Sequence, residues 1–182
     1  AEVGWELQAR RAAALQSFSA VFSSLFDAIA RFDLPVRLHY LPSWVGAAGA
    51  SEARRLLSLR RETDLRLGVS SSGPHRDTYR FLVHERPLEA VASTGQLRLC
   101  SLVLRVAQAR YVHACTGRLP ILLIDDVILE LDGERKRAFV ENLPPREQAF
   151  FTFLSDEPYE GYRGPRSLTF RVRSGRVEPC TA

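Results

Sequence analysis

Hydrophobic and polar residues alternate along this chain in patterns that define its elements. From residue 2 to 31 apolar side chains recur every three or four positions, Gly4 is the only glycine, and proline is absent. This stretch predicts an amphipathic helix of roughly 40 Å that packs against a partner helix. The same spacing predicts further helices over 51–67 and 96–114. The apolar positions of the first helix are Leu7, Leu15, Phe18, Phe22, Leu25 and Ile29.

Strict alternation marks the strands. Val36, Leu38 and Tyr40 alternate with polar residues and predict a short strand with one buried face, on which His39 is a solvated residue more than a ligand. The run through Tyr79, Phe81 and Val83 returns to this pattern after a turn, as an edge strand in the simplest interpretation. Residues 167–177 read as a closing hairpin around Ser174 and Gly175.

The central pattern is different, because residues 121–124 are four consecutive aliphatic side chains. Such a run predicts a strand buried on both faces, as in a parallel sheet, with 148–154 as the neighbouring strand. Asp125 and Asp126 follow directly, at the carboxyl edge where open α/β sheets bind ligands. The layout is that of a Walker B element, in which one Asp holds Mg²⁺ and the next orients or deprotonates water. An ordinary strand followed by an acidic helix cap is the alternative, and Asp132 is the expected N-cap of the next helix.

Together these elements predict the α/β class: a buried sheet with flanking helices.

Composition narrows the class of protein. No apolar run was expected to reach the ~18 residues that cross a bilayer, so we expect a soluble, cytoplasmic protein with no membrane partner. Three cysteines lack metal-ligand spacing, and their odd number fits a reducing compartment. A net charge of +4 favours a polyanionic partner only weakly. Lys136 is the single lysine and no Gly-x-x-x-x-Gly precedes it, so a phosphate-binding P-loop is absent from the chain.

Three further stretches are candidates for binding. Ser93, Thr94, Gly95 and Gln96 open a helix, where free backbone N–H groups and the helix dipole suit a phosphate. The turn at Gly73-Pro74 presents a polar trio that would line a polar site: His75, Arg76 and Asp77. The helix over 51–67 carries basic residues that contact DNA phosphates or, equally well, form a salt-bridged face with neighbouring acids: Arg54, Arg55, Arg60 and Arg61.

In this order the motifs resemble the C-terminal half of the RecF family, ABC-type ATPases of bacterial DNA recombination and repair. The resemblance rests on 64–68, on Gly-Pro-His-Arg-Asp at 73–77, on Ser-Thr-Gly-Gln at 93–96, on 121–126 and on 129–132. It covers nearly the whole chain. The resemblance implies the C-terminal part of an ABC-type ATPase head over 65–182, preceded by the remnant of a helical arm with one short strand over 1–64. The 73–77 element is distinctive of RecF, whereas the 93–96 signature loop and Walker B are shared with SMC-like and Rad50-like heads.

The resemblance implies roles for named residues. The signature loop would meet the γ-phosphate of ATP bound by another subunit, Asp125 would hold Mg²⁺, Asp126 would be the catalytic carboxylate, and Asp132 would belong to the D-loop that crosses the interface. ATP would close a homodimer on DNA at gaps and at single-/double-strand junctions, in a cytoplasmic, nucleoid-associated protein. RecO and RecR would be its partners in loading the recombinase.

The chain also departs from the family pattern. Leu129 replaces the usual D-loop Ser, and the switch-histidine position corresponds to Thr152 or Ser155. Because the Walker A lobe is missing from this sequence, we expect no ATP hydrolysis by the chain alone. The alternatives are an SMC-like or Rad50-like head fragment, and a non-catalytic truncated module that binds DNA, RecR or an intact head.

Overall fold

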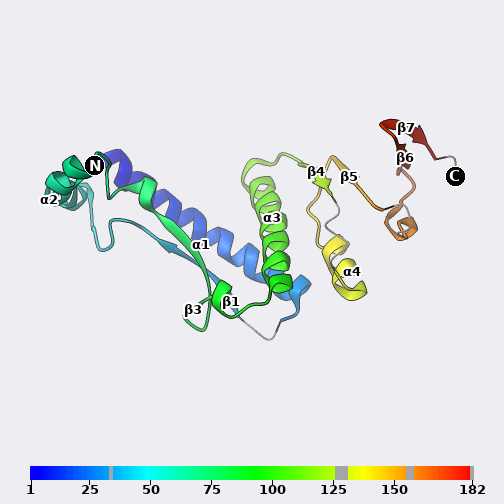
Figure 1. The fold of residues 1–182 in the computed structure, drawn as a ribbon, viewed down its shortest axis with the longest axis horizontal. Helices are drawn as coiled ribbons and strands as arrows, with labels where there is room; N and C mark the ends of the chain where they lie inside the picture. The colour runs from blue at the N-terminus through cyan, green and yellow to red at the C-terminus, as the bar shows by residue number, and fades with distance from the viewer. Residues whose placement is uncertain (33–34, 126–130, 155–157, 181–182) are drawn as a thin grey trace.

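The computed structural model describes residues 1–32, 35–125, 131–154 and 158–180 as helices, strands and connecting loops (Figure 1). The helices are α1 (Glu2–Ala30), α2 (Ala50–Leu67), α3 (Thr94–Thr116) and α4 (Gly133–Glu141). The strands are β1 (Val36–Leu41), β2 (Thr78–Val83), β3 (Arg86–Pro87), β4 (Ile121–Ile124), β5 (Gln148–Phe151), β6 (Phe170–Arg173) and β7 (Arg176–Pro179). Three short 3-10 turns complete them: η1 (Pro74–Arg76), η2 (Leu88–Ala90) and η3 (Glu160–Tyr162).

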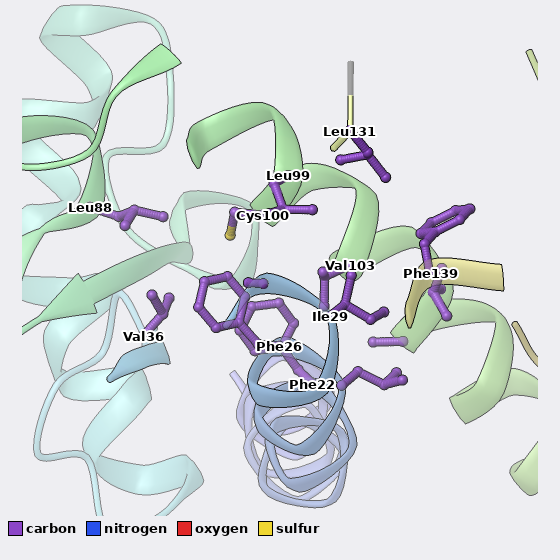
Figure 2. Packing of buried hydrophobic residues seen from close by; sticks show 14 of the residues in the cluster. Phe22, Phe26, Ile29, Val36, Leu88, Leu99, Cys100, Val103, Leu131 and Phe139 are labelled. Atoms are coloured by element: carbon purple, nitrogen blue, oxygen red, sulfur yellow. The ribbon is translucent and has the colours of Figure 1, made fainter. Parts of the chain in front are cut away.

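The core lies where α1 packs against α3, which confirms that the first helix has a helical partner. Phe22 and Ile29 of α1 and Val103 of α3 are fully buried in this contact (Figure 2). The aromatic rings of α1 reach the sheet as well, since the Phe22 and Phe81 ring centroids are 5.3 Å apart. The three- and four-residue spacing of α1 therefore builds one continuous face that joins the first sheet to α3.

Helix α1 overturns one expectation. By length and hydropathy it could cross a membrane, because only Asp27 is charged between Ala12 and Ala30. Its most apolar half, however, is where Phe22, Phe26 and Ile29 are buried against the rest of the protein. A core helix passes the same test of composition, and the burial of Phe22, Phe26 and Ile29 accounts for part of the apolar run, of which 22% is buried.

The first sheet has the order β1-β2-β3, with β1 and β2 antiparallel over their whole length. Strand β2 is therefore central, and its interpretation as an edge strand was wrong: the short β3 pairs with its end at Leu82 and Val83. Val36 and Val83 point into the core from directly opposite positions.

The second sheet contains β4 and β5, which are parallel as predicted. Burial of β4 on both faces was wrong, because Ile121 and Leu123 are 58% and 77% exposed while Ile124 packs into the core. With only two strands in this sheet, nothing in the described part of the chain covers its outer face.

The hairpin β6–β7 closes the described chain, as the sequence predicted. Ser174 and Gly175 both have positive φ, 47° and 77°, which is the backbone that a tight two-residue hairpin turn requires. The predicted division at residue 64 stays a prediction.

Candidate functional site

The signature loop begins α3 through a complete capping box. The Ser93 hydroxyl accepts from the Gln96 backbone N–H at 3.3 Å, and the Gln96 side-chain oxygen accepts from the Ser93 N–H at 2.8 Å. This reciprocal pair fixes where the helix starts. It also leaves the amides of Thr94 and Gly95, the first two of the helix, without a partner among the described residues.

Neither the backbone conformation nor the packing around Gly95 requires a glycine at this position. Its backbone φ is not positive, and a Cβ placed there would meet nothing within 4 Å. The loop is exposed, and the positive end of the α3 dipole points out of it. The missing side chain therefore leaves room for an anionic ligand to approach the backbone.

Asp125 is an exposed residue at the carboxyl end of β4. Its carboxylate accepts a hydrogen bond of 2.6 Å from the Thr152 hydroxyl, which follows the adjacent parallel strand β5. Parallel pairing brings these two ends together, although 27 residues separate them. Carboxylate and hydroxyl oxygens are ligands that suit Mg²⁺, so this pair fits a divalent cation of that kind.

Asp132 caps α4, as predicted, by accepting from the Arg135 backbone N–H at 2.9 Å. That backbone hydrogen bond, with the Arg135 guanidinium 2.7 Å away, lowers the pKa of the Asp132 carboxyl. Arg135 also donates to the Ala30 carbonyl at 3.2 Å and lies over the Phe32 ring at 5.2 Å. Through Arg135, Asp132 is tied to the C-terminal end of α1.

Asp77 is the most densely hydrogen-bonded carboxylate described, and its side chain is only 1% exposed. Gln8 donates to Oδ1 at 2.6 Å and the Ser43 N–H donates to the same oxygen at 2.9 Å. Oδ2 accepts from Tyr40 at 2.5 Å and from Arg11 at 2.8 Å. One carboxylate thus joins α1, β1 and the loop after β1 to the start of β2.

The charge of Asp77 is held by these donors. Burial by itself would raise its pKa, but the hydrogen bonds from Tyr40, the Ser43 amide, Gln8 and Arg11 outweigh burial and the pKa lies below its usual range. Burial, followed by the adjacent carboxylate, raises the pKa of Tyr40. The group is an ionised Asp paired with a neutral phenol and a guanidinium.

The side chains of the polar trio, His75, Arg76 and Asp77, point in two different directions. His75 and Arg76 are exposed, and their side chains meet the Ser70 carbonyl at 3.2 and 2.9 Å. Asp77 points the other way, into the buried network. The structure therefore does not place the three groups around one polar site.

The arginines of α2 are exposed and partly paired. Arg54 and Arg55 lie 3.3 and 3.4 Å from Glu2 and Glu52, so the salt-bridged alternative holds for these two. An open groove of about 520 Å³ runs along the helix. It is lined by Arg54, Leu57, Ser58, Arg61, Asp64, Leu65, Gly68, Val69 and Ser70. Arg60 is exposed beside the Asp64 end.

Three predicted positions, Asp126, Leu129 and Ser155, lie outside the described residues. Within the described ranges no group of three or more His, Cys, Asp or Glu side chains gathers as a metal cluster. The cysteines are free thiols, and burial raises the pKa of Cys100 to about 11.

Sequence reasoning missed two sets of contacts. The donors to Asp77 come from three separate stretches, and only the spacing of Gln8 and Arg11 on one helix face could have suggested them. The contact of Arg135 with Ala30 spans 105 positions and has no local signal.

Curated proteins resemble this chain over nearly its whole length. The "DNA replication and repair protein RecF" of Treponema pallidum is 41% identical over 176 residues, which are 96% of this chain and 49% of that protein. Proteins of the same name are 32% identical over 178 residues in Desulforudis audaxviator and 31% identical over 182 residues in Microcystis aeruginosa. The chain spans about half the length of the curated relatives it matches. No family model matches it.

Solved structures share the fold. The "recombination mediator protein RecF-ATP in RecFOR pathway" aligns with a TM-score of 0.77 at 23% identity, covering 98% of this chain and 47% of that one. The corresponding RecF-ATPrS structure aligns with a TM-score of 0.73 at 21% identity. The predicted α/β fold class is confirmed by this likeness.

Proposed function

Because this chain belongs to the RecF family of DNA replication and repair proteins, we propose that it forms the part of such a protein that completes another subunit's ATP site. The observation that carries the proposal is the uncovered first turn of α3: two unpartnered amides, a glycine with free space around it, and the positive end of a 23-residue helix. This turn suits the γ-phosphate of a nucleotide held elsewhere.

The proposed geometry requires a second subunit. The signature loop precedes the N-terminal end of α3 and β4 follows its C-terminal end, so the length of the helix separates the two motifs (Figure 1). At 1.5 Å per residue that length is about 34 Å. Ser93, Thr94, Gly95 and Gln96 would therefore serve a nucleotide on a facing head, in an ATP-dependent homodimer of the whole protein.

At the other end, Asp125 would hold Mg²⁺ with Thr152 orienting its carboxylate. The cation would neutralise charge on the phosphates. Asp126 would position the attacking water, and Asp132, fixed by Arg135, would lie in the D-loop at the dimer interface. Turnover then depends on the phosphate-binding loop of a complete head, and we expect none from this chain alone.

The biological setting follows from the family by inference. ATP-driven closure would hold DNA at gaps and single-/double-strand junctions, and RecO and RecR would act with the closed protein to load the recombinase. This setting implies a cytoplasmic, nucleoid-associated location.

The exposed β4 face favours a second reading, in which the chain acts as a binding module for an intact head. Ile121 and Leu123 present an apolar surface beside Asp125. In relatives about twice as long, other parts of the protein are available to cover it.

The test uses an intact RecF, that of Treponema pallidum, as the nucleotide-bearing partner. We expect the chain to associate with it in ATP and not in ADP, measured by sedimentation velocity with a labelled chain. Gly95→Asp should abolish that association, because a carboxylate about 4 Å from a phosphate charge costs about 4 kcal/mol at an effective dielectric of about 20, roughly 10³-fold.

The substitution leaves the fold intact, since Gly95 has open space and an acid in the first helical turn is favourable. Gly161→Asp is the matched control, because Gly161 also meets nothing within 4 Å and lies outside the site. Equal ATP-dependent association of the Gly95→Asp chain would refute the proposal, as would no association of the unaltered chain.

A further inference from the structure

The outer face of the β1–β2 sheet is basic. Val36, Leu38, Phe81 and Val83 turn toward α1 and the core, so the alternate positions turn outward. Arg37 and His39 of β1 and Arg80 of β2 are three of these outward residues, and both arginines are exposed. Neither arginine has an ion pair or hydrogen bond within the described chain. We propose that this outer face is a docking surface for the phosphate backbone of double-stranded DNA.

Among the residues that the structure describes, no acid is seen to pair with the outer face; Asp33, three positions before β1, lies outside those residues. Strands β1 and β2 contain neither Asp nor Glu in their twelve positions. The carboxylate directly before β2, Asp77, is turned inward and occupied by Gln8, Arg11, Tyr40 and Ser43. The nearest following acid, Glu85, lies beyond β2 in the turn to β3. The described strands and the carboxylates that flank β2 therefore supply no negative charge to this surface.

Within the part of the chain that the structure describes, the arrangement has no stabilising partner. His39 lies directly opposite Arg80 in the antiparallel register, and Arg37 lies two residues along the same strand face. Basic groups directly opposite one another oppose strand pairing to the extent that both are charged. Their concentration on one face is explained by an anionic partner.

DNA fits this face better than an acidic protein does. Sequence-independent DNA binding uses Arg and Lys contacts to phosphates and needs no apolar anchor. Protein interfaces concentrate their energy in buried aromatic and Arg anchors, whereas the outward positions of these strands hold no aromatic ring other than the imidazole of His39. The remaining outward residues are Leu41, Thr78 and Leu82.

Two of the four arginines that the sequence pointed to on α2 are already paired. Arg54 and Arg55 of α2 have acidic partners at 3.3 and 3.4 Å. The inference rests on the proposed DNA-repair function, but it assigns DNA to a surface separate from the signature loop. Its failure is therefore distinguishable from failure of the ATP-dependent association tested with Gly95→Asp.

The experiment measures binding of the chain to a labelled duplex by fluorescence anisotropy over a series of KCl concentrations. Each lost phosphate contact should reduce the slope of log K against log[salt] by about one. For Arg37→Ala/Arg80→Ala we expect a slope smaller by about two, weaker binding to every duplex sequence, and an unchanged circular dichroism spectrum. Arg37→Lys/Arg80→Lys keeps the charge and should keep the slope.

Arg171→Ala/Arg173→Ala is the matched control, since these are also exposed strand arginines two positions apart, with Glu178 directly opposite Arg171. Arg60→Ala/Arg61→Ala tests α2 directly. An unchanged slope for the Arg37/Arg80 pair, or an equal loss for the control pair, would overturn the assignment. Absence of duplex binding by the unaltered chain would also overturn the assignment. Binding of an acidic protein, and not of DNA, through Arg37 and Arg80 would show that DNA is the wrong partner.

Discussion

Asp77→Asn should destabilise the protein strongly, although it changes a single atom. Both carboxylate oxygens accept two hydrogen bonds: Oδ1 from Gln8 and Ser43, and Oδ2 from Tyr40 and Arg11. An amide offers only one acceptor oxygen, so either orientation of Asn turns its NH₂ group toward two donors. One pure donor, either the Arg11 guanidinium or the Ser43 N–H, then has no acceptor, and the negative charge disappears.

The magnitude follows from these contacts. A hydrogen bond to a charged group contributes about 1.5–3 kcal/mol, and removing one partner of a buried pair costs about 3–5 kcal/mol. The side chain of Arg11 is 34% exposed and can be rehydrated, which places the cost at the low end. We expect the free energy of unfolding to fall by about 3 kcal/mol, or roughly 6–12 °C in Tm for a chain of this size.

The assay is urea unfolding followed by circular dichroism, with Asp27→Asn as the control. Asp27 is an aspartate within α1 whose side chain is exposed to solvent. Its substitution should change the free energy of unfolding by less than about 0.5 kcal/mol. A loss below about 1 kcal/mol for Asp77→Asn would refute the reasoning that this network holds α1, β1 and β2 together.

Two further predictions concern the same network and the second sheet. Because the folded pKa of Asp77 is depressed, its contribution to stability is fully present above its unfolded pKa of about 3.9 and is lost as pH falls through the folded pKa. Unfolding measured at a series of pH values should therefore show a stability difference between the unaltered chain and Asp77→Asn that is constant above about pH 5 and shrinks below about pH 4. A difference that grows toward low pH would contradict the assigned ionisation. Leu123→Glu should change the free energy of unfolding by less than about 0.5 kcal/mol, because Leu123 is 77% exposed. Ile124→Glu, at a position that is 8% exposed, should cost about 3 kcal/mol or more. Equal costs of the two substitutions in chemical denaturation would mean that both faces of β4 are covered.

The local elements were predictable because each has a local cause. The spacing of Phe18, Phe22 and Ile29 defines α1, and the pair at Ser93 and Gln96 marks the start of α3 by capping chemistry that needs only four residues. The parallel pairing of β4 with β5 was predicted from the aliphatic run at 121–124, with the apolar run at 148–154 as its neighbour. The helix cap at Asp132 was of the same kind.

The errors came from patterns with more than one physical solution. An aliphatic run such as 121–124 is the same whether a strand is covered on both faces or on one, and the sequence does not say how many layers surround it. Likewise a 19-residue stretch with one charge fits a membrane or a core. The burial of Phe22 and Ile29 against α3 is a tertiary fact.

The sequence by itself determined the order of the main helices and strands, the helix start at Ser93 and the family resemblance, since each depends on residues close together in the chain. Only the tertiary structure decided that Asp77 turns away from His75 and Arg76, that Thr152 meets Asp125, and that Arg37, His39 and Arg80 share the outer face of β1 and β2. These outcomes depend on contacts between residues 27 to 69 positions apart. The chain must fold before such groups meet, and burial then selects which charges are neutralised and which stay at the surface.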